Sequence, residues 1–184
     1  MTNTLNRNRG YLPHFDSAGA IQSLTFRLAD SLPATVVAEL RSRPDTADLH
    51  AEIELALDAG RGSCTLGRPE AAAVVAAALR HFDGQRYRLL AWCVMPNHVH
   101  VVIALLGATK LSDVVFAWKS FTAKRLNAMY GTSGRFWQPD YFDRMIRDEV
   151  HLAAAIAYVE ENPVSAGLAA RPGDWRASSA FDGG

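Results

Sequence analysis

The stretch RYRLLAWCVMPNHVHVVIALL, residues 86–106, decides the fold. Two apolar runs rich in β-forming residues flank Pro96 and Asn97, a turn-forming pair, so the stretch predicts a β-hairpin. Side chains alternate between the two faces of a strand. His98 and His100 therefore project side by side from one face of the second strand, while Val99 points to the opposite face.

Strands and helices are also predicted on both sides of the hairpin in the sequence. A period-two run over 21–28 predicts a strand, Pro33 opens a helical stretch, and helices are expected over 46–59 and from Pro69 to about 82. After the hairpin we expect a helix over 111–130, a short irregular strand over 136–146 and a helix over 149–162. Pro163 should end that helix, because the residue before proline is pushed out of the α region. The apolar face of the 111–130 helix comprises Leu111, Val114, Val115, Trp118, Phe121, Leu126 and Met129.

This order predicts an α+β fold: a ferredoxin-like βαββαβ antiparallel sheet with helices on one face, followed by a C-terminal helix. In that topology the first and third strands are central, so the histidine strand would pair with the strand over 21–28. We expect an N-terminal arm over 1–18, one domain over 19–168 and a C-terminal tail over 169–184.

Composition fits a globular chain. Its 184 residues are 49% hydrophobic and 21% charged, which suits a single domain with its own core. No apolar run approaches the length of a membrane span, and the polar N-terminus lacks a secretory signal, so a cytoplasmic protein is expected. Cys64 and Cys93 form no CxxC pair and are expected to be reduced thiols.

The net charge is zero, but its distribution is uneven. Residues 30–60 hold seven acidic residues and two arginines, whereas residues 110–147 hold seven basic residues and three aspartates. A local basic face is what phosphate binding requires, although charged stretches are also common on ordinary solvated surfaces.

Two imidazoles on one rigid strand can converge on a single divalent cation, and histidine is the commonest metal ligand near neutral pH. The alternative is that His98 and His100 are half-buried polar residues on a sheet face. A bare HxH tripeptide often occurs by chance, so the pattern alone leaves both interpretations open.

Of five tyrosines, Tyr158 is the strongest candidate nucleophile. It lies on the predicted last helix with Asn162 four residues later, on the same face. The Asn162 amide oxygen is a suitable ligand for Mg²⁺ or Mn²⁺, and Glu161, close to the same face, is an alternative. Tyr141 is the second candidate nucleophile, unless it packs as a strand residue or stacks on a base.

The segment MPNHVHVVI resembles the HUH motif of single-tyrosine transposases, and the chain over about 10–180 resembles the REP-associated tyrosine transposases. The matching blocks, in order, are YLPHFD, LTFRLADSLP, GRGSCTLGRPE, HFDGQRYRLLAWCVMPNHVHVV, WKSFTAKRLN, GRFWQPDYFDRMIRDE and AYVEENPVSAGL. The resemblance implies an enzyme that nicks and rejoins single-stranded or hairpin DNA, such as a REP-like palindrome, through a 5′-phosphotyrosine intermediate.

The same resemblance implies a role for each candidate residue. Tyr158, on a catalytic C-terminal helix, would attack the DNA, while His98, His100 and Asn162 would hold Mg²⁺ or Mn²⁺. Relatives often carry glutamine at the third-ligand position, so asparagine is a shorter variant. The phosphotyrosine link conserves the phosphodiester energy, so rejoining needs no nucleotide cofactor. Consistently, the sequence has no glycine-rich phosphate loop.

Basic and aromatic residues after the hairpin suggest a path for DNA, and Lys119, Lys124 and Arg125 are expected beside the proposed site. Basic side chains can follow the backbone while aromatic rings stack on unpaired bases. For Trp137, a place in the core is the alternative. The candidate DNA-binding residues are Lys119, Lys124, Arg125, Trp137, Tyr141, Arg144 and Arg147.

Other classes remain as alternatives. A ferredoxin-like RNA-binding module shares the element order but carries aromatic residues on its central strands, which HVHVVI lacks. A domesticated DNA-hairpin-binding protein would keep the fold without cleaving, and a plasmid relaxase or replication initiator would share the HUH chemistry. The sequence leaves open the target DNA, the preferred metal and whether the protein is a monomer or a homodimer.

Overall fold

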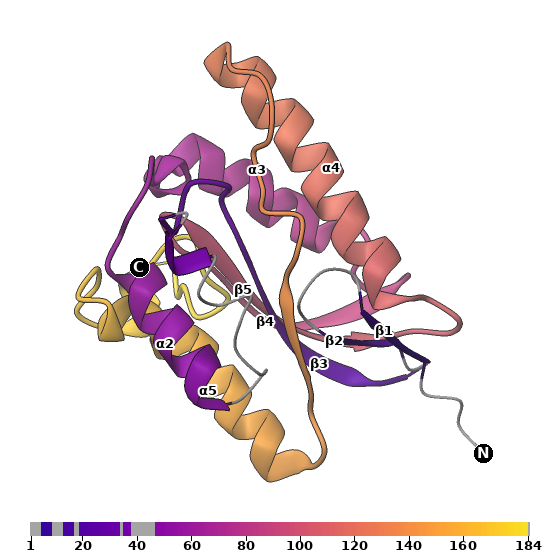
Figure 1. Ribbon diagram of the computed structural model, residues 1–184. Helices are drawn as coiled ribbons and strands as arrows, with labels where there is room; N and C mark the ends of the chain where they lie inside the picture. Colours follow the sequence, from indigo (N-terminus) through magenta and orange to yellow (C-terminus); the bar gives the residue numbers. More distant parts are fainter. Residues whose placement is uncertain (1–4, 9–12, 17–18, 34, 38–46, 184) are drawn as a thin grey trace.

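A four-stranded antiparallel sheet forms the centre of the molecule (Figure 1). The computed structural model describes residues 5–8, 13–16, 19–33, 35–37 and 47–183. The strand order is β4-β5-β3-β6, so the first and third strands of the predicted pattern are central, as expected. The strands are β3 (Ile21–Arg27), β4 (Tyr87–Val94), β5 (His98–Leu105) and β6 (Phe142–Met145).

Among the described residues, the helices with predicted counterparts lie close to the predicted bounds: α2 (Ala47–Asp58), α3 (Pro69–Arg80), α4 (Leu111–Tyr130) and α5 (Glu149–Ser165). The predicted end of the last helix at Pro163 is wrong, since Pro163 lies in the final turn of α5. Proline removes one backbone donor there. The chain nevertheless satisfies the late carbonyls, because Ala166 N donates to Asn162 O and Leu168 N to Pro163 O.

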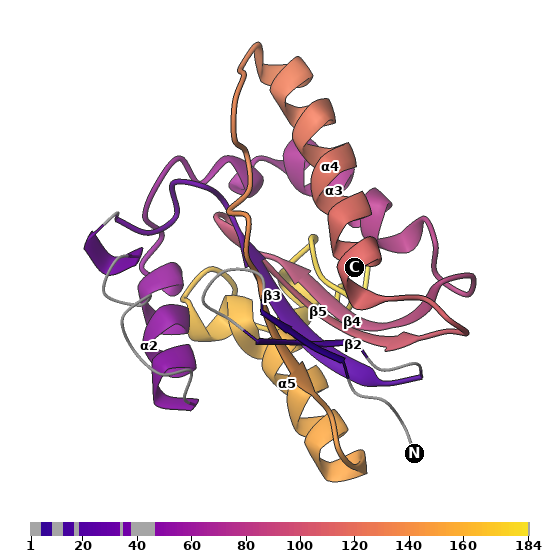
Figure 2. The same ribbon diagram turned by 45° about the vertical axis from the view of Figure 1, so that its right-hand side comes forward.

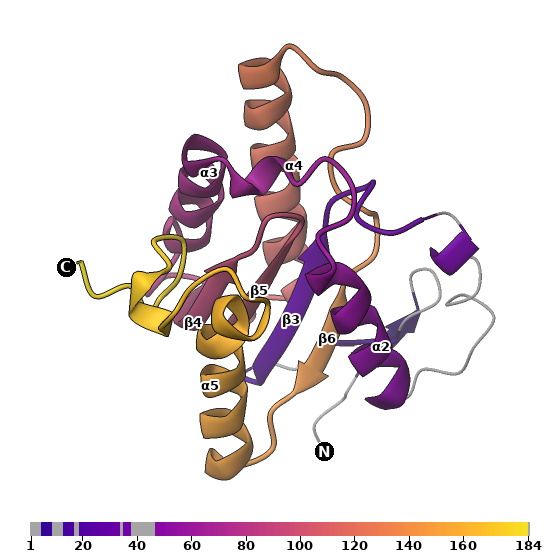
Figure 3. The ribbon, with the colours of Figure 1, turned by 90° about the vertical axis from the view of Figure 1, so that its left-hand side faces the viewer.

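Helices cover both faces of the sheet, not one (Figure 3). Helices α3 and α4 pack on the face that carries Phe26 and Val101. Helix α5 packs on the opposite face through Val159, which is buried with Val102. Helix α2 lies on that second face too, because its apolar side packs against Phe142 of β6. The expectation of a single covered face is therefore corrected.

Aromatic contacts fill the core between the sheet and α4. The Phe26 ring lies 4.9 Å from the Trp137 ring, edge to face, and Trp118 is also buried. Phe121 and Met129, expected on the buried face of α4, are instead 58% and 40% exposed. The C-terminal end of α4 extends past the sheet (Figures 1 and 2), yet Leu126 in that part of the helix is still buried. The buried side of α4 runs through Trp118, Thr122 and Leu126, and Phe121 and Met129 lie outside it.

The described parts of the two terminal segments contain regular structure that the sequence did not predict. Strands β1 (Leu5–Asn8) and β2 (Pro13–Asp16) pair as an antiparallel hairpin within the predicted arm. The predicted tail contains a short 3₁₀ helix, η2 (Pro172–Asp174), and then runs along the edge of β4. There Val94 N donates to Ala177 O at 2.8 Å. Strand β6 is shorter than predicted, and Trp137 makes only an isolated bridge to Leu28.

Candidate active site

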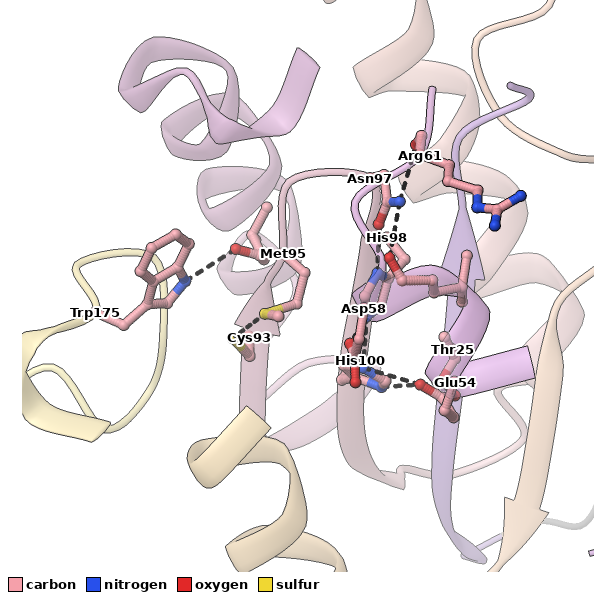
Figure 4. Close-up of polar contacts among 12 residues, drawn as sticks. Thr25, Glu54, Asp58, Arg61, Cys93, Met95, Asn97, His98, His100 and Trp175 are labelled. Carbon is pink, nitrogen blue, oxygen red and sulfur yellow. Dashed lines mark hydrogen bonds and ion pairs between the residues drawn. The ribbon is translucent and has the colours of Figure 1, made fainter. Parts of the chain in front are cut away.

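Two buried histidines form the centre of the site, on the face of β5 that α2 and α5 cover. His98 and His100 are 0% and 2% exposed, and their Nε2 atoms lie 2.8 Å apart (Figure 4). The other nitrogen of each ring has its own partner. His98 Nδ1 lies 2.7 Å from Asn97 Oδ1, and His100 Nδ1 lies 2.9 Å from Thr25 Oγ1.

These partners determine which ring nitrogen carries the proton. Asn97 Nδ2 donates to the Leu57 and Arg61 carbonyls, so its Oδ1 must face His98 as an acceptor. The Thr25 hydroxyl donates its one proton to Glu54 Oε1, so it accepts from His100 Nδ1. These contacts fit the tautomer with the proton on Nδ1 of each ring, the form in which both rings direct an Nε2 lone pair at the same point.

Helix α2 brings carboxylates to this point. Glu54 Oε2 lies 3.3 Å from His100 Nε2, and Asp58 Oδ1 lies 3.9 Å from His98 Nε2 (Figure 4). Ligand atoms of Glu54, His98 and His100 all lie within 4.8 Å of one another. Nitrogen and carboxylate oxygen in one small cluster are a donor set for a divalent metal ion.

The electrostatics of the cluster fit a cation. Burial lowers the pKa of His98 well below its usual value, helped by His100, and burial lowers the pKa of His100 to about 4. Both rings are thus neutral at pH 7, the form that binds metal. Burial and the nearby Glu54 charge raise the pKa of Asp58, although His100 opposes this. The two Nε2 atoms lie 2.8 Å apart, and in the metal-binding tautomer a shared cation would remove the repulsion between their lone pairs.

Helix α5 places Tyr158 beside the histidines. The Tyr158 ring lies 5.6 Å from the His100 ring and is 47% exposed, at a cavity of about 500 Å³. Burial raises the pKa of the Tyr158 hydroxyl, as do the Glu54 and Asp58 charges and a hydrogen bond to Glu54, whereas a hydrogen bond with Asn162 lowers it. Tyr158 is therefore a neutral phenol in the metal-free protein.

Of the two candidate third ligands on α5, Asn162 is buried and Glu161 is exposed. Asn162 Oδ1 is itself buried and accepts no hydrogen bond within the described part of the chain. The structure therefore turns Asn162 inward beside Tyr158 and leaves Glu161 in solvent.

The candidate DNA-binding residues divide between the two faces. Arg144 is exposed and lines the same cavity as Tyr158, and Arg147 is exposed nearby in the chain. Lys124 and Arg125 are exposed on α4, which packs on the face opposite the histidines. The expectation that these two residues adjoin the site is wrong, because alternate residues of β5 face the two helical layers.

Three further candidates are engaged in the fold. Trp137 and Tyr141 are 4% and 8% exposed and belong to the core on the face away from the histidines. Neither presents a ring on which a base could stack, and Tyr141 is not placed to act as the nucleophile. Lys119 Nζ donates to the Pro139 and Asp140 carbonyls, and burial lowers its pKa to about 8. Trp137 and Tyr141 are therefore core residues, and Lys119 is held in the fold by its contacts with the two carbonyls.

Four residues of the site were not predicted from the sequence: Glu54, Asp58, Thr25 and Asn97. The spacing of Glu54 and Asp58, one turn apart on a predicted helix, put them on one face and was the available signal. Thr25 is opposite His100 only through the pairing register of β3 and β5, which no local pattern reveals.

Comparisons with known proteins agree with this geometry. The family described as transposase IS200 like matches residues 71–162, half of the chain. The chain belongs to the IS200-like transposase family. The matched segment includes His98, His100, Tyr158 and Asn162, whereas α2 precedes it.

A solved structure also resembles this member of the IS200-like family in fold. A REP-associated tyrosine transposase bound to a REP hairpin has a TM-score of 0.56 and 17% identity, covering 95% of this chain and 82% of its own. A transposase-like protein of Deinococcus radiodurans R1 has a TM-score of 0.46 and 19% identity, covering 86% and 98%. A search among curated proteins returned no match. No helix in the described residues is long and apolar enough to cross a bilayer.

The buried neutral histidines predict a pH-dependent stability in the metal-free protein. The unfolded chain takes up protons below about pH 6.5, whereas folded His100 does so only near pH 4, so stability falls as pH falls through that window. Between pH 7 and pH 5 the contribution of His100 is on the order of 2 kcal/mol. Urea unfolding in EDTA should show that His100→Gln loses less stability over this range than wild type. The exposed-site control His81→Gln should behave like wild type, and equal losses in all three proteins would contradict the prediction.

Proposed function

We propose that this protein is a metal-dependent single-stranded DNA endonuclease and strand transferase that acts on REP-like palindromic hairpins through a 5′-phosphotyrosine intermediate. One observation carries the proposal. Tyr158 and His100 come from elements far apart in the sequence, yet their rings lie 5.6 Å apart. A nucleophile beside a buried metal-binding cluster is the arrangement that phosphodiester transfer to a side chain requires.

In this proposal His98 and His100 hold a Mg²⁺ or Mn²⁺ ion together with Asn162. Their lone pairs already converge, and the buried Asn162 oxygen lies one helical turn from Tyr158. When bound, the cation would polarise the scissile phosphate and offset the charge that develops during attack. Asn97 and Thr25 keep both rings in the metal-binding tautomer.

Tyr158 performs the covalent step. Its oxygen attacks phosphorus, the bond to the 3′ oxygen breaks, and the phenol proton passes through solvent to that leaving oxygen. The products are a 5′-phosphotyrosine and a free 3′-hydroxyl. Burial, together with the negative charges of Glu54 and Asp58, raises the pKa of Tyr158 and keeps it protonated, so the metal-free protein has a weak nucleophile. A bound cation would offset the two carboxylate charges.

The DNA is proposed to contact two separate surfaces. Arg144, at the cavity beside Tyr158, is placed to contact the single strand near the cleaved phosphate. Lys124 and Arg125, on the projecting end of α4, are placed to contact the duplex of a hairpin at a distance from the site. A relative of the same fold is bound to a REP hairpin, which supports a hairpin as the substrate.

We expect Tyr158→Phe to eliminate the covalent protein–DNA adduct while preserving folding and metal binding, because it removes one oxygen and little volume. Labelled hairpin DNA incubated with Mn²⁺, followed by peptide mapping, measures this directly. Tyr141→Phe is the matched control and should still form the adduct, since Tyr141 lies in the core on the other face. Label on the Tyr141 peptide would overturn the assignment.

The two basic surfaces should respond to different DNAs. Arg144→Ala should weaken binding of a single-stranded oligonucleotide and reduce its salt slope by about 0.7, whereas Lys124→Ala/Arg125→Ala should reduce the slope for a hairpin by about 0.9 per lost contact. Fluorescence anisotropy across a salt series distinguishes them. If the double variant affected the single strand and spared the hairpin, this division of the DNA path would be wrong.

A further inference from the structure

Helix α2 covers the histidine pair but shares little of the main core. Its Ile53 and Leu57 side chains pack with Leu32 and Phe142 in a small cluster of their own. Its polar side carries Glu54 and Asp58, which point toward His98 and His100 (Figure 4). Two hydrogen bonds join α2 to the residues that hold the histidine rings. The Thr25 hydroxyl donates to Glu54 Oε1, and Asn97 Nδ2 donates to the Leu57 carbonyl.

We propose that Glu54 and Asp58 are metal ligands that let the protein bind a divalent transition-metal ion without DNA, and that this ion fastens α2 over the histidine strand. The proposal rests on the proposed function for the use of a metal at this site. It adds ligands that precede residues 71–162, the segment matched by the family, and it makes α2 part of the metal centre.

The distances support coordination. Glu54 Oε2 is 3.3 Å from His100 Nε2, close to the separation of two ligands on a common ion, while Asp58 Oδ1 is 3.9 Å from His98 Nε2. Glu54 is therefore the principal carboxylate ligand, and Asp58 is the weaker one. Both side chains are about one-fifth exposed, so the ion would lie at the inner end of the cavity that opens beside Tyr158.

The donor chemistry identifies the class of ion. Two imidazole nitrogens favour a transition metal, and two carboxylate oxygens suit a hard divalent cation, so the combined set favours Mn²⁺ over Mg²⁺. Two carboxylates also balance the charge of a divalent ion, which lowers the cost of placing it in a largely buried site. Glu54, His98 and His100, with Asp58 nearby as the weaker donor, can therefore retain the ion before a phosphate arrives.

Coupling to α2 follows from mass action. The donors come from two elements, α2 and β5, and only the docked position of α2 brings them within reach of one ion. An ion that binds only the docked state stabilises that state. Metal loading should therefore protect the backbone of α2 even when no DNA is present.

The protein is titrated with Mn²⁺ in the absence of DNA, and binding is measured as the decrease in the EPR signal of the free ion. Glu54→Gln should weaken Mn²⁺ binding by about 10- to 100-fold, and Asp58→Asn should weaken it less. Glu52→Gln is the matched control, an exposed residue on the same helix, and should bind like wild type. If Glu54→Gln and Asp58→Asn both bound Mn²⁺ as tightly as wild type, the proposal would be overturned.

Hydrogen exchange of the wild-type protein gives a second test that needs no variant. Mn²⁺ should slow exchange of the α2 amides, and Mg²⁺ at the same concentration should slow it less. Unchanged α2 exchange at saturating Mn²⁺ would refute the coupling. An adduct assay separates this inference from the proposed function. If the protein forms the adduct and Glu54→Gln binds Mn²⁺ as tightly as wild type, only the inference is wrong. Weakened affinity in Glu54→Gln, with no adduct in wild type, defeats only the proposed function.

Discussion

The convergence of two imidazole lone pairs on one side of β5 is the constraint on which the site depends. The Nδ1 atom of each ring has a hydrogen-bond partner, Asn97 for His98 and Thr25 for His100, and these partners hold the two Nε2 atoms 2.8 Å apart. Burial lowers the pKa of both rings and keeps them uncharged near neutral pH, so no additional proton occupies the space between the two Nε2 atoms. Two neutral imidazoles in this arrangement are suited to bind one divalent cation.

The sheet allows this arrangement because its two faces have separate tasks. On one face, Val99 and Val101 belong to the core under α3 and α4, which supplies most of the apolar burial. On the other face, His98 and His100 meet the polar side of α2 and Tyr158 of α5. A stable core on one side of β5 thus holds the histidines in position, while the active site occupies the other side.

Local patterns predicted the parts of the site that lie within single elements. The hairpin, the paired histidines and the spacing of Tyr158 and Asn162 depend only on strand and helix periodicity, and the structure has each of these features. Periodicity does not say which layer covers a face. For that reason Lys124 and Arg125 were expected beside the site although α4 packs opposite, and Trp137 was a candidate for base stacking although it is buried.

The contribution of α2 was missed for the same physical reason. Glu54 and Thr25 reach His100 through tertiary packing and strand register, between segments widely separated in the chain. The most direct test of the metal centre is anomalous diffraction from crystals of the DNA-free protein soaked in Mn²⁺. We expect one strong anomalous peak within coordination distance of the Nε2 atoms of both His98 and His100. A peak elsewhere, or none near these two atoms at saturating Mn²⁺, would contradict the metal centre on which the catalytic proposal depends.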